Sequence, residues 1–475
     1  MSSPWFWGGL LVACLGAVAL VNGYDGLYGQ DAYAHLNYAR DLQAYFRDGK
    51  GLGSYQWPRL YAFLGALWPF GNPQMWMQAL SIGSAGAFLA LSIQWLRRQL
   101  PGLAASPWLA PLAFAMVGCS PLLLRNSISI MADAPSLACS AGALLAGAAY
   151  QAGGKWRHLV LAGLGTGGAI ALRYPAALVM LPMGLVWAWE VLKRRDFLAG
   201  LAFILLACLP MLPQLLLPAA VNEGLDQPFR HQHFIQWRLG NFLGREFVQM
   251  DGYNAYPFPN LIAALSMFWH PRSLGLGCLS LLALPFLWRK MPKIHWPAVA
   301  AILVNTAFLA GIPFQNPRFL LPELPFVALL LLPIWIWIWE NALKAVRLRQ
   351  LAFALMLMAN LGLGYLATRQ FFQLNGLERT MAAELKARHR PGQQLFELSL
   401  QPMLRARDVP QRDCSMWEGG LPEPKPGDLL LFNLPKFGQQ FAGMWPMKNW
   451  DSLHEGWKWQ EVRTFDQEWK LYEIR

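Results

Sequence analysis

The sequence predicts an all-α polytopic membrane protein with a small soluble domain at its C-terminus. Of its 475 residues, 55% are hydrophobic and only 14% are charged, whereas soluble domains carry about 25% charged residues. Apolar runs recur along the first 369 residues, and several approach the roughly 20 residues that a helix needs to cross the hydrocarbon core. Residues 370–475 lose this pattern and become polar.

We predict about eleven membrane spans from these runs. The first lacks the basic segment that opens a signal peptide, so we expect it to remain in the mature protein. The fifth and sixth meet around Arg173 and Pro175, where short helices can join at a turn. The eleven ranges are 5–22, 74–96, 107–124, 131–150, 158–172, 174–192, 197–217, 271–288, 296–313, 319–339 and 350–368.

Lys and Arg cluster in alternate loops between these spans. Cytoplasmic loops carry an excess of such cations, so we predict that the basic loops are cytoplasmic. They contain Arg97 and Arg98; Lys155 and Arg157; Lys193, Arg194 and Arg195; Arg289, Lys290 and Lys293; and Lys344, Arg347 and Arg349. The remaining loops, 23–73, 125–130, the turn at Arg173, 218–270 and 314–318, are then external, as is 370–475.

Two external loops are too apolar and aromatic for plain connections. In Tyr24–Arg47, five residues fall on one side at 100° per residue, which predicts an interfacial amphipathic helix. They are Ala34, Tyr38, Leu42, Tyr45 and Phe46. In the second loop, 218–270, the stretch 222–260 is rich in His, Arg, Gln and aromatics, and is expected to lie along the membrane or to cap a cavity.

The C-terminal segment has the pattern of a small α/β or α+β domain. A helix-like stretch, Leu377–His389, precedes the strand-like runs QLFELSL, DLLLFNL, EVRTF and WKLYEIR, which Pro and Gly separate. We therefore divide the chain into a transmembrane domain, 1–369, and an external soluble domain, 370–475.

Charge and cysteine content exclude two other classes of protein. The formal charge of +12 does not indicate nucleic-acid binding, because the cations are dispersed between apolar runs and form no single basic patch. Five of the six cysteines lie in or beside apolar runs, and Cys414 stands alone in the polar segment. No disulfide framework is predicted.

External acids and arginines near the ends of the spans are the candidate functional groups, because ionisable side chains at this depth are costly unless paired or functional. Guanidinium groups compensate the charge of a phosphate, and a carboxylate accepts the proton of an attacking hydroxyl. This combination suits the transfer of a group from a phosphate. The candidates are Asp25, Asp31, Tyr33, His35, Arg125, Asp133, Arg173, His270 and Arg318.

Each candidate also has a structural interpretation. Asp31 can cap the amphipathic helix, Asp133 can open a helix two residues before a proline, and Asp25 belongs to an Asp-Gly turn. Arg173 and Arg318 lie at span ends, where arginine often extends toward the headgroups.

Histidines give little indication of a metal site. His231 and His233 have a spacing that is common by chance, and no third ligand is evident. His270, beside Pro271, has the position of an interface residue. A divalent metal stays open as a cofactor, and no other cofactor is indicated.

The order of four features resembles the GT-C membrane glycosyltransferases, in the branch of the protein O-mannosyltransferases and the lipid A aminoarabinose transferases. After the first span comes the acidic loop GQDAYAHLNYARDL, and an acid lies at the outer end of the fourth span in SISIMADAPSLA. The runs GLGTGGAIALRYPAALVMLP and NPRFLLPELP follow. The resemblance covers most of 1–340.

The resemblance implies an inverting sugar transfer from a polyprenyl-phosphate donor on the external face of the membrane. It also implies that Asp31 is the principal catalytic acid residue. We expect Asp133 to support the acceptor or the sugar, and Arg173 and Arg318 to hold the phosphate. Many family members have two adjacent acids in the first loop, but here Gln30 precedes Asp31. The sequence therefore gives no support to a two-carboxylate or metal role for this pair of positions.

Two other classes of function compete with this hexosyl- or pentosyltransferase. A transporter or lipid flippase is disfavoured, because transporters commonly show repeats and polar groups near the bilayer midplane, which this sequence lacks. A receptor or assembly protein that binds through 370–475 stays open. For the enzyme we expect a lipid, glycan or protein acceptor, and a bacterial inner membrane with the C-terminal domain in the periplasm.

Overall fold

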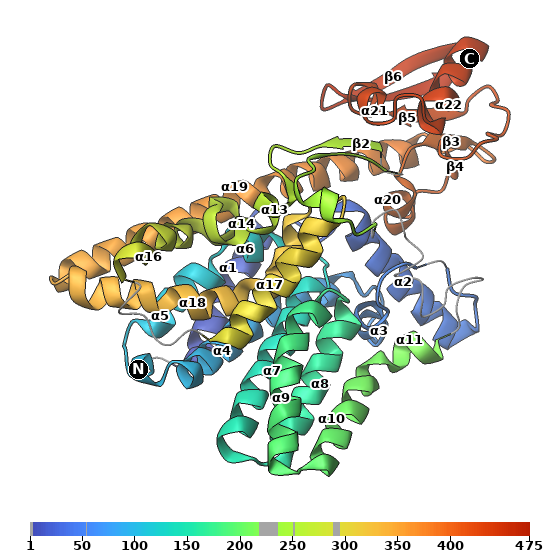
Figure 1. Cartoon of the computed structure of the whole chain (residues 1–475). Coiled ribbons are helices and arrows are strands. Elements are labelled where there is room, and N and C mark those ends of the chain that lie inside the picture. Colours follow the sequence, from blue (N-terminus) through green and yellow to red (C-terminus); the bar gives the residue numbers. More distant parts are fainter. Residues whose placement is uncertain (1–2, 54, 218–235, 250–251, 288–294) are drawn as a thin grey trace.

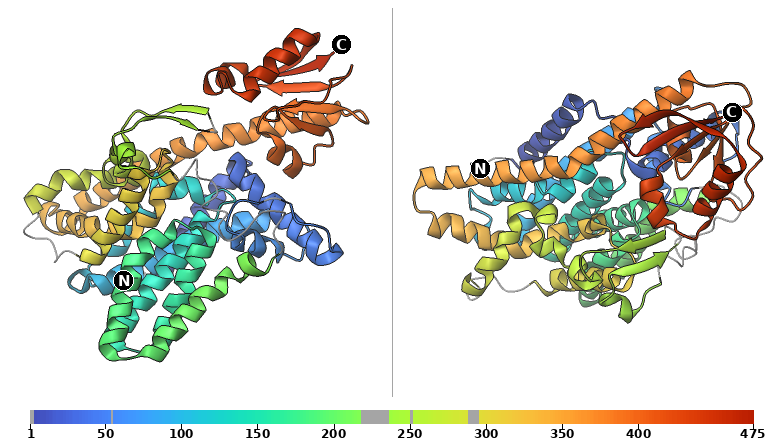
Figure 2. Two further views of the ribbon diagram at one scale, coloured as in Figure 1. Left: turned by 45° about the vertical axis from the view of Figure 1, so that its right-hand side comes forward. Right: turned by 90° about the horizontal axis from the view of Figure 1, so that it is seen from above.

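The computed structural model describes residues 3–53, 55–217, 236–249, 252–287 and 295–475. Figure 1 shows a large helical body with a small sheet domain at one end, and Figure 2 shows that the long helix α19 joins the two. The helical body, the external helices and the mixed C-terminal sheet confirm the predicted fold class.

Six helical segments in the described part of the chain are long and apolar enough to cross a membrane. A bent pair, Leu109–Gly118 with Pro121–Ser127, makes a seventh if it forms one broken span. The chain is therefore an integral, multi-pass membrane protein. The six are α1 (Pro4–Val21), α4 (Gln74–Gln99), α9 (Ala176–Arg194), the segment Phe197–Leu216 with α10 (Phe197–Cys208) and α11 (Leu212–Leu216), the segment Pro317–Ala342 with η7 (Pro317–Glu323) and α18 (Leu324–Trp337), and α19 (Val346–Ala387).

This number is smaller than the eleven spans that the sequence predicts, although helical segments lie in all eleven ranges. Most helices in the remaining predicted ranges are short or broken. Helix α7 is long enough, but it contains too many small and polar residues to count as an apolar span. The helices in these ranges are α5 (Leu109–Ala113), α6 (Pro121–Ser127), α7 (Asp133–Gly153), α8 (Trp156–Leu172), α15 (Pro271–Leu274), α16 (Ser280–Leu287) and α17 (Trp296–Gly311). Apolar runs predict helices, but they do not reveal where a helix bends or ends.

Helix α8 packs closely between α7 and α10, as Figure 1 shows. A Cβ atom on Gly167 would lie 1.9 Å from the carbonyl oxygen of Ala207 in α10, and one on Gly165 would lie 2.8 Å from that of Cys139 in α7. Small residues at such crossings let helix backbones approach. The glycine-rich run 163–168 therefore has a packing role on two faces of α8.

The loop after the first span contains α2 (Gly29–Asp48) and α3 (Leu60–Ala66). On the predicted apolar side of α2, Tyr38 and Leu42 are buried, whereas Phe46 stays 53% exposed. More of α2 is buried than that side alone, because α3 and α20 (Gln401–Ala406) both pack against it.

The loop 218–270 contains a hairpin and two short helices in its described part. The hairpin pairs β1 (Glu246–Gln249) with β2 (Gly252–Ala255), and α13 (Asn260–Ala264) and α14 (Ser266–Trp269) follow. Strand β2 packs against α21 of the C-terminal domain. The predicted candidates His231 and His233, and the basic loop at Arg289–Lys293, lie outside the described residues.

The C-terminal domain is a five-stranded mixed sheet in the order β4-β3-β5-β7-β6. Strands β3 and β5 are interior, parallel to each other and buried on both faces. The continuous apolar sequence LLLF of β5 indicates this burial, whereas β3 buries the polar side chains of Gln394 and Glu397. Four strands match the predicted runs; β4 was missed because it is short and polar. The elements are β3 (Gln394–Glu397), β4 (Arg412–Ser415), β5 (Leu429–Phe432), α21 (Leu434–Gln440), α22 (Trp445–Gly456), β6 (Trp459–Phe465) and β7 (Trp469–Ile474).

Helix α19 runs without a break through the domain boundary expected between residues 369 and 370. The sheet begins only at Gln394, so the last part of α19 is a rigid stem between the two parts of the chain (Figure 2).

Candidate active site

Asp31 lies in the first turn of α2, at the start of the helix that follows the first span. It forms an ion pair with Arg318 of η7, and both side chains are almost buried. The residue that caps α2 is Tyr28, which makes no side-chain cap bond. The capping interpretation of Asp31 is therefore wrong, because its carboxylate is directed to a guanidinium and not to the helix end.

Asp133 is the first residue of α7, and Arg173 follows the last residue of α8. The Nε atom of Arg173 lies 3.2 Å from Oδ1 of Asp133, and both side chains are buried. The second carboxylate oxygen, Oδ2, has no hydrogen-bond partner among the described residues. This pair joins the start of α7 to the end of α8.

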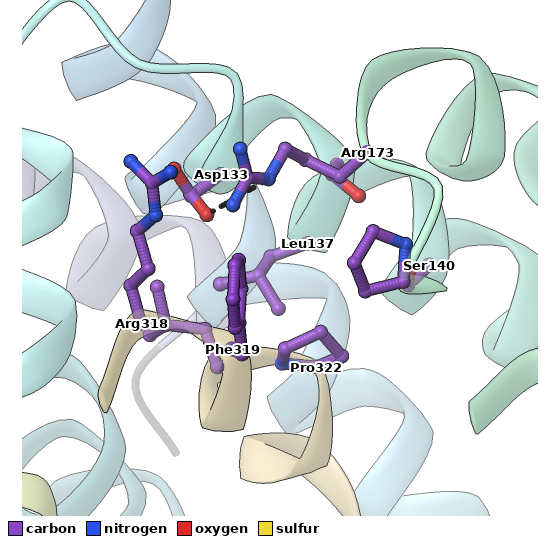
Figure 3. A pocket seen from close by; sticks show the side chains of 10 residues that line it. Asp133, Leu137, Ser140, Arg173, Arg318, Phe319 and Pro322 are labelled. Carbon is purple, nitrogen blue, oxygen red and sulfur yellow. Dashed lines mark ion pairs between the residues drawn. The ribbon is translucent and has the colours of Figure 1, made fainter. Parts of the chain in front are cut away.

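Three of these four charged residues line one small pocket (Figure 3), whereas Asp31 contacts it only through its ion pair with Arg318. Asp133, Arg173 and Arg318 line it together with Phe319 and the Ser136–Ser140 side of α7. The guanidinium carbons of Arg173 and Arg318 lie 5.7 Å and 5.6 Å from the ring centre of Phe319. The structure thus brings together two acids and two arginines whose formal charges cancel.

Asp31 and His35 occupy successive turns of α2, but burial affects them differently. Burial acts to raise the pKa of Asp31, but the charges of Arg318 and Arg173 outweigh it and hold that pKa below its ordinary value. Burial lowers the pKa of His35 to about 3. At neutral pH the site therefore contains an ionised Asp31 and a neutral imidazole.

The imidazole of His35 belongs to an aromatic cluster beside the ion pairs. Its Nδ1 lies 2.5 Å from the hydroxyl of Tyr55, while Nε2 is buried with no hydrogen-bond partner in the described ranges. Tyr61 packs edge-on against the same ring at 5.0 Å. His35 is thus held within this aromatic cluster, and its Nε2 is a buried polar atom without a partner among the described residues.

Arg125 and His270 lie in other surroundings. The guanidinium of Arg125 covers the ring of Phe371 at 4.6 Å and forms no ion pair with any described acid. It lies within electrostatic range of Arg318 and Arg272. His270 accepts a hydrogen bond at Nδ1 from the backbone N–H of Arg272 at 3.1 Å, so it caps α15.

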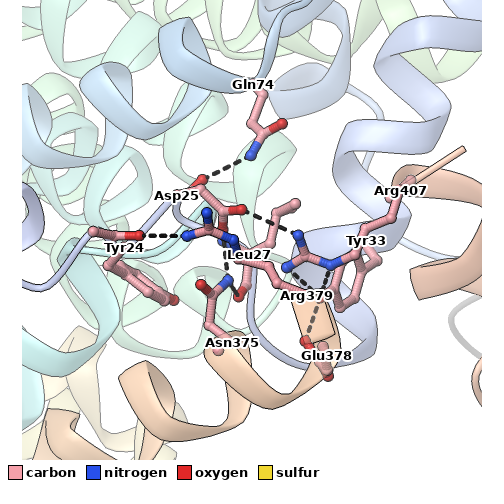
Figure 4. A network of polar contacts seen from close by, with 12 residues as sticks. Tyr24, Asp25, Leu27, Tyr33, Gln74, Asn375, Glu378, Arg379 and Arg407 are labelled. Atoms are coloured by element: carbon pink, nitrogen blue, oxygen red, sulfur yellow. Dashed lines mark hydrogen bonds and ion pairs between the residues drawn. The ribbon is translucent and has the colours of Figure 1, made fainter. Parts of the chain in front are cut away.

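Asp25 and Tyr33 belong to a second polar network, which joins the first loop to α19 and the C-terminal domain (Figure 4). Arg407 donates to Asp25 Oδ2 at 3.2 Å and to the hydroxyl of Tyr33 at 3.1 Å. Asn375 donates to Asp25 Oδ1 at 2.6 Å. Sequence reasoning missed Arg407 and Asn375, because nothing near them in the chain indicates a partner in the first loop.

The described residues contain no group of three or more His, Cys, Asp or Glu side chains placed to hold a metal ion. Of the acids near the pocket, Asp31 and Asp133 each face an arginine. This set of groups suits an anionic substrate, which guanidinium binds well.

Comparison with known proteins identifies the fold. No protein-family model and no curated protein matches the sequence. The structure is similar to the crystal structure of ArnT from Cupriavidus metallidurans bound to undecaprenyl phosphate, with a TM-score of 0.59 over 97% of each chain at 13% identity. Similarity to the apo state of ArnT has a TM-score of 0.55 at 12% identity over the same share of each chain. At this identity, the comparison shows a shared fold.

Proposed function

We propose that this protein is an inverting glycosyltransferase that moves a hexose or pentose from a polyprenyl-phosphate donor to an acceptor outside the membrane. The observation that carries the proposal is the buried cluster of two acids and two arginines, on a fold shared with a protein crystallised with undecaprenyl phosphate. The cellular setting we propose is a bacterial inner membrane with the site on the periplasmic face.

In the proposed reaction, an acceptor hydroxyl oxygen bonds to the anomeric carbon as the bond from this carbon to the phosphate oxygen breaks. The electron pair of that bond leaves with the phosphate, and the Asp31 carboxylate takes the hydroxyl proton. A single displacement inverts the anomeric centre. Asp133 orients the acceptor or the sugar through its unpartnered Oδ2.

The ion pairs also suggest how donor binding activates the base. An arriving phosphate competes with Asp31 and Asp133 for the guanidinium groups of Arg318 and Arg173. When Arg318 turns toward the phosphate, Asp31 loses the charge that holds its pKa down. Its carboxylate then becomes a stronger base at the moment when the donor is in place.

Arg125 is the third guanidinium in the proposed phosphate site. It lies in electrostatic range of Arg318 and has no described carboxylate to compensate it. A phosphate between Arg318 and Arg125 would supply this missing negative charge, while the polyprenyl chain extends into the apolar surroundings of the spans.

The test is transfer of radiolabelled sugar by the purified protein in liposomes, from a panel of undecaprenyl-phosphate hexoses and pentoses to cell-envelope acceptors. We expect Asp31→Asn to lower the rate about 10²–10⁴-fold, the usual contribution of a general base. The matched control is Asp48→Asn, an acid at the far end of the same helix that pairs only with Arg47 and Lys50. Full transfer by folded Asp31→Asn, or a donor that crosses the bilayer unchanged, would contradict the proposal.

A further inference from the structure

We infer that Arg407, in the C-terminal domain, is a positioning residue that holds the turn presenting Asp31. The expected effect of Arg407 on catalysis rests on the proposed function, whereas its contacts with the first loop do not. Arg407 does not line the pocket of Figure 3; it acts through the polypeptide segment that enters α2.

The segment before Asp31 turns at two glycines. Gly26 and Gly29 both adopt positive φ angles, +83° and +67°, which favour glycine. Asp25 precedes these glycines, and Tyr33 follows them inside α2. Because glycines restrict the backbone little, contacts at Asp25 and at Tyr33 are needed to keep the Asp31 carboxylate in place.

A single guanidinium makes both contacts. Arg407 donates through Nη1 to the Asp25 carboxylate at 3.2 Å, and through Nε and Nη2 to the Tyr33 hydroxyl at 3.3 Å and 3.1 Å. Its side chain is only 10% exposed. The planar fork of arginine suits such two-point binding, which the point charge of lysine does not reproduce.

Helix α19 completes the network from the other side (Figure 4). Asn375 donates to Asp25 Oδ1 at 2.6 Å and to the carbonyl oxygen of Leu27 at 2.7 Å, and the Tyr33 hydroxyl donates to Glu378. Both oxygens of Asp25 thus accept hydrogen bonds from protein donors. This arrangement suits a structural clamp better than a substrate ligand.

The C-terminal domain also contacts α2 farther along its length. Asn37 donates to the carbonyl oxygen of Pro402 at 2.9 Å, and Arg40 donates to that of Ala406 at 2.9 Å. Arg405 pairs with Asp41, but its side chain is 53% exposed. Because exposed ion pairs contribute little, Arg405 offers a matched control for the buried Arg407.

The experiment compares Arg407→Ala, Arg407→Lys and Arg405→Ala in the purified full-length protein, with size-exclusion and thermal unfolding as folding checks. Backbone hydrogen exchange of residues 24–36 reports the clamp without any substrate. We expect Arg407→Ala to speed this exchange at least about 10-fold, a local opening of the turn, and Arg405→Ala to leave it unchanged. If Arg407→Ala does not fold, Arg407→Lys is the test variant, and we expect a smaller increase in the exchange rate of residues 24–36.

Transfer kinetics give the second readout. If Asp31 moves by about 1 Å, kcat is expected to fall on the order of 10²-fold, while the KM for the donor changes little. Adding Asp25→Ala to Arg407→Ala should cost less than the sum of the two single losses, because both changes remove the Arg407–Asp25 contact. Unchanged exchange in Arg407→Ala, or fully additive losses in the double variant, would overturn the inference. If exchange is faster in Arg407→Ala but the unchanged protein transfers no sugar, only the proposed function is overturned.

Discussion

Two buried carboxylates, Asp31 and Glu397, show how neighbouring groups decide the charge of a residue. Both are removed from water, which disfavours the ionised form. Asp31 faces two guanidinium groups, which hold its pKa below the ordinary value. Glu397, in β3, has no such partner, and burial raises its pKa to about 7. Asp31 therefore stays ionised at physiological pH, whereas Glu397 exchanges its proton near neutral pH.

Glu397 makes the stability of the C-terminal domain depend on pH. Its pKa is raised on folding from an ordinary 4.5, so the folded state binds the proton more tightly. Below about pH 4.5 Glu397 is protonated in both states, and the free energy of unfolding is not reduced. Above about pH 7 the buried carboxylate is ionised, and the free energy of unfolding is reduced by the full amount. We expect stability to fall across this window by roughly 3 kcal/mol at most.

Glu397→Gln should remove this dependence, because the amide keeps an oxygen to accept the backbone N–H of Leu400. Chemical unfolding of the full-length protein, followed at the C-terminal domain between pH 4 and 8, measures the difference. Glu455→Gln, a change at an exposed acid of α22, is the control and should leave the pH profile as it is. A parallel profile for Glu397→Gln and the unchanged protein would contradict the prediction.

At the residue scale, the sequence predicted which side chains gather but not how they pair. Asp31, Asp133, Arg173 and Arg318 all follow from the positions of span ends, and the structure brings them together. Their pairing depends on helix packing between distant segments, which local patterns do not report. The same limit hid Arg407, whose contacts reach back across 382 residues to Asp25.

Among the helices, α8 shows why a glycine-rich run is needed. Gly163 and Gly167 face the backbone of α10, and Gly165 and Gly168 face α7. The sequence showed this run only as part of a family resemblance. The glycines are needed because α8 lies so close to α7 and α10 that a methyl group at these positions would meet a carbonyl oxygen or a neighbouring side chain.

Gly167→Val is therefore expected to separate α8 from α10. Overpacking of this kind costs about 1–3 kcal/mol, and a Cβ at this position would lie only 1.9 Å from the Ala207 carbonyl oxygen. The measurement is unfolding of the purified protein in mixed detergent micelles. The matched change is Gly184→Val in α9, where a Cβ would meet nothing within 4 Å. Equal stability of the two variants would show that the α8–α10 crossing is not tight.

For the whole molecule, α19 links the orientation of the membrane part to that of the C-terminal domain. Its 42 residues extend on the order of 60 Å at 1.5 Å per residue, about twice the hydrocarbon thickness of roughly 30 Å. The helix starts beside the basic residues Lys344 and Arg347 and ends at the sheet domain. If that basic loop is cytoplasmic, the sheet domain is external, on the same side as Asp31.

Cysteine labelling tests this orientation directly. In a Cys208→Ser background, which removes the one exposed native cysteine of the described residues, Glu455→Cys and Arg157→Cys each place a single exposed thiol. The first lies in the sheet domain, and the second lies in the first turn of α8, next to a predicted basic loop. We expect a membrane-impermeant maleimide to label Glu455→Cys in intact spheroplasts and Arg157→Cys only after lysis, because basic loops stay in the cytoplasm. Labelling of Arg157→Cys in intact spheroplasts would reverse the topology and place Asp31 on the cytoplasmic face. In that case, the proposed transfer would require a donor on the inner leaflet of the membrane.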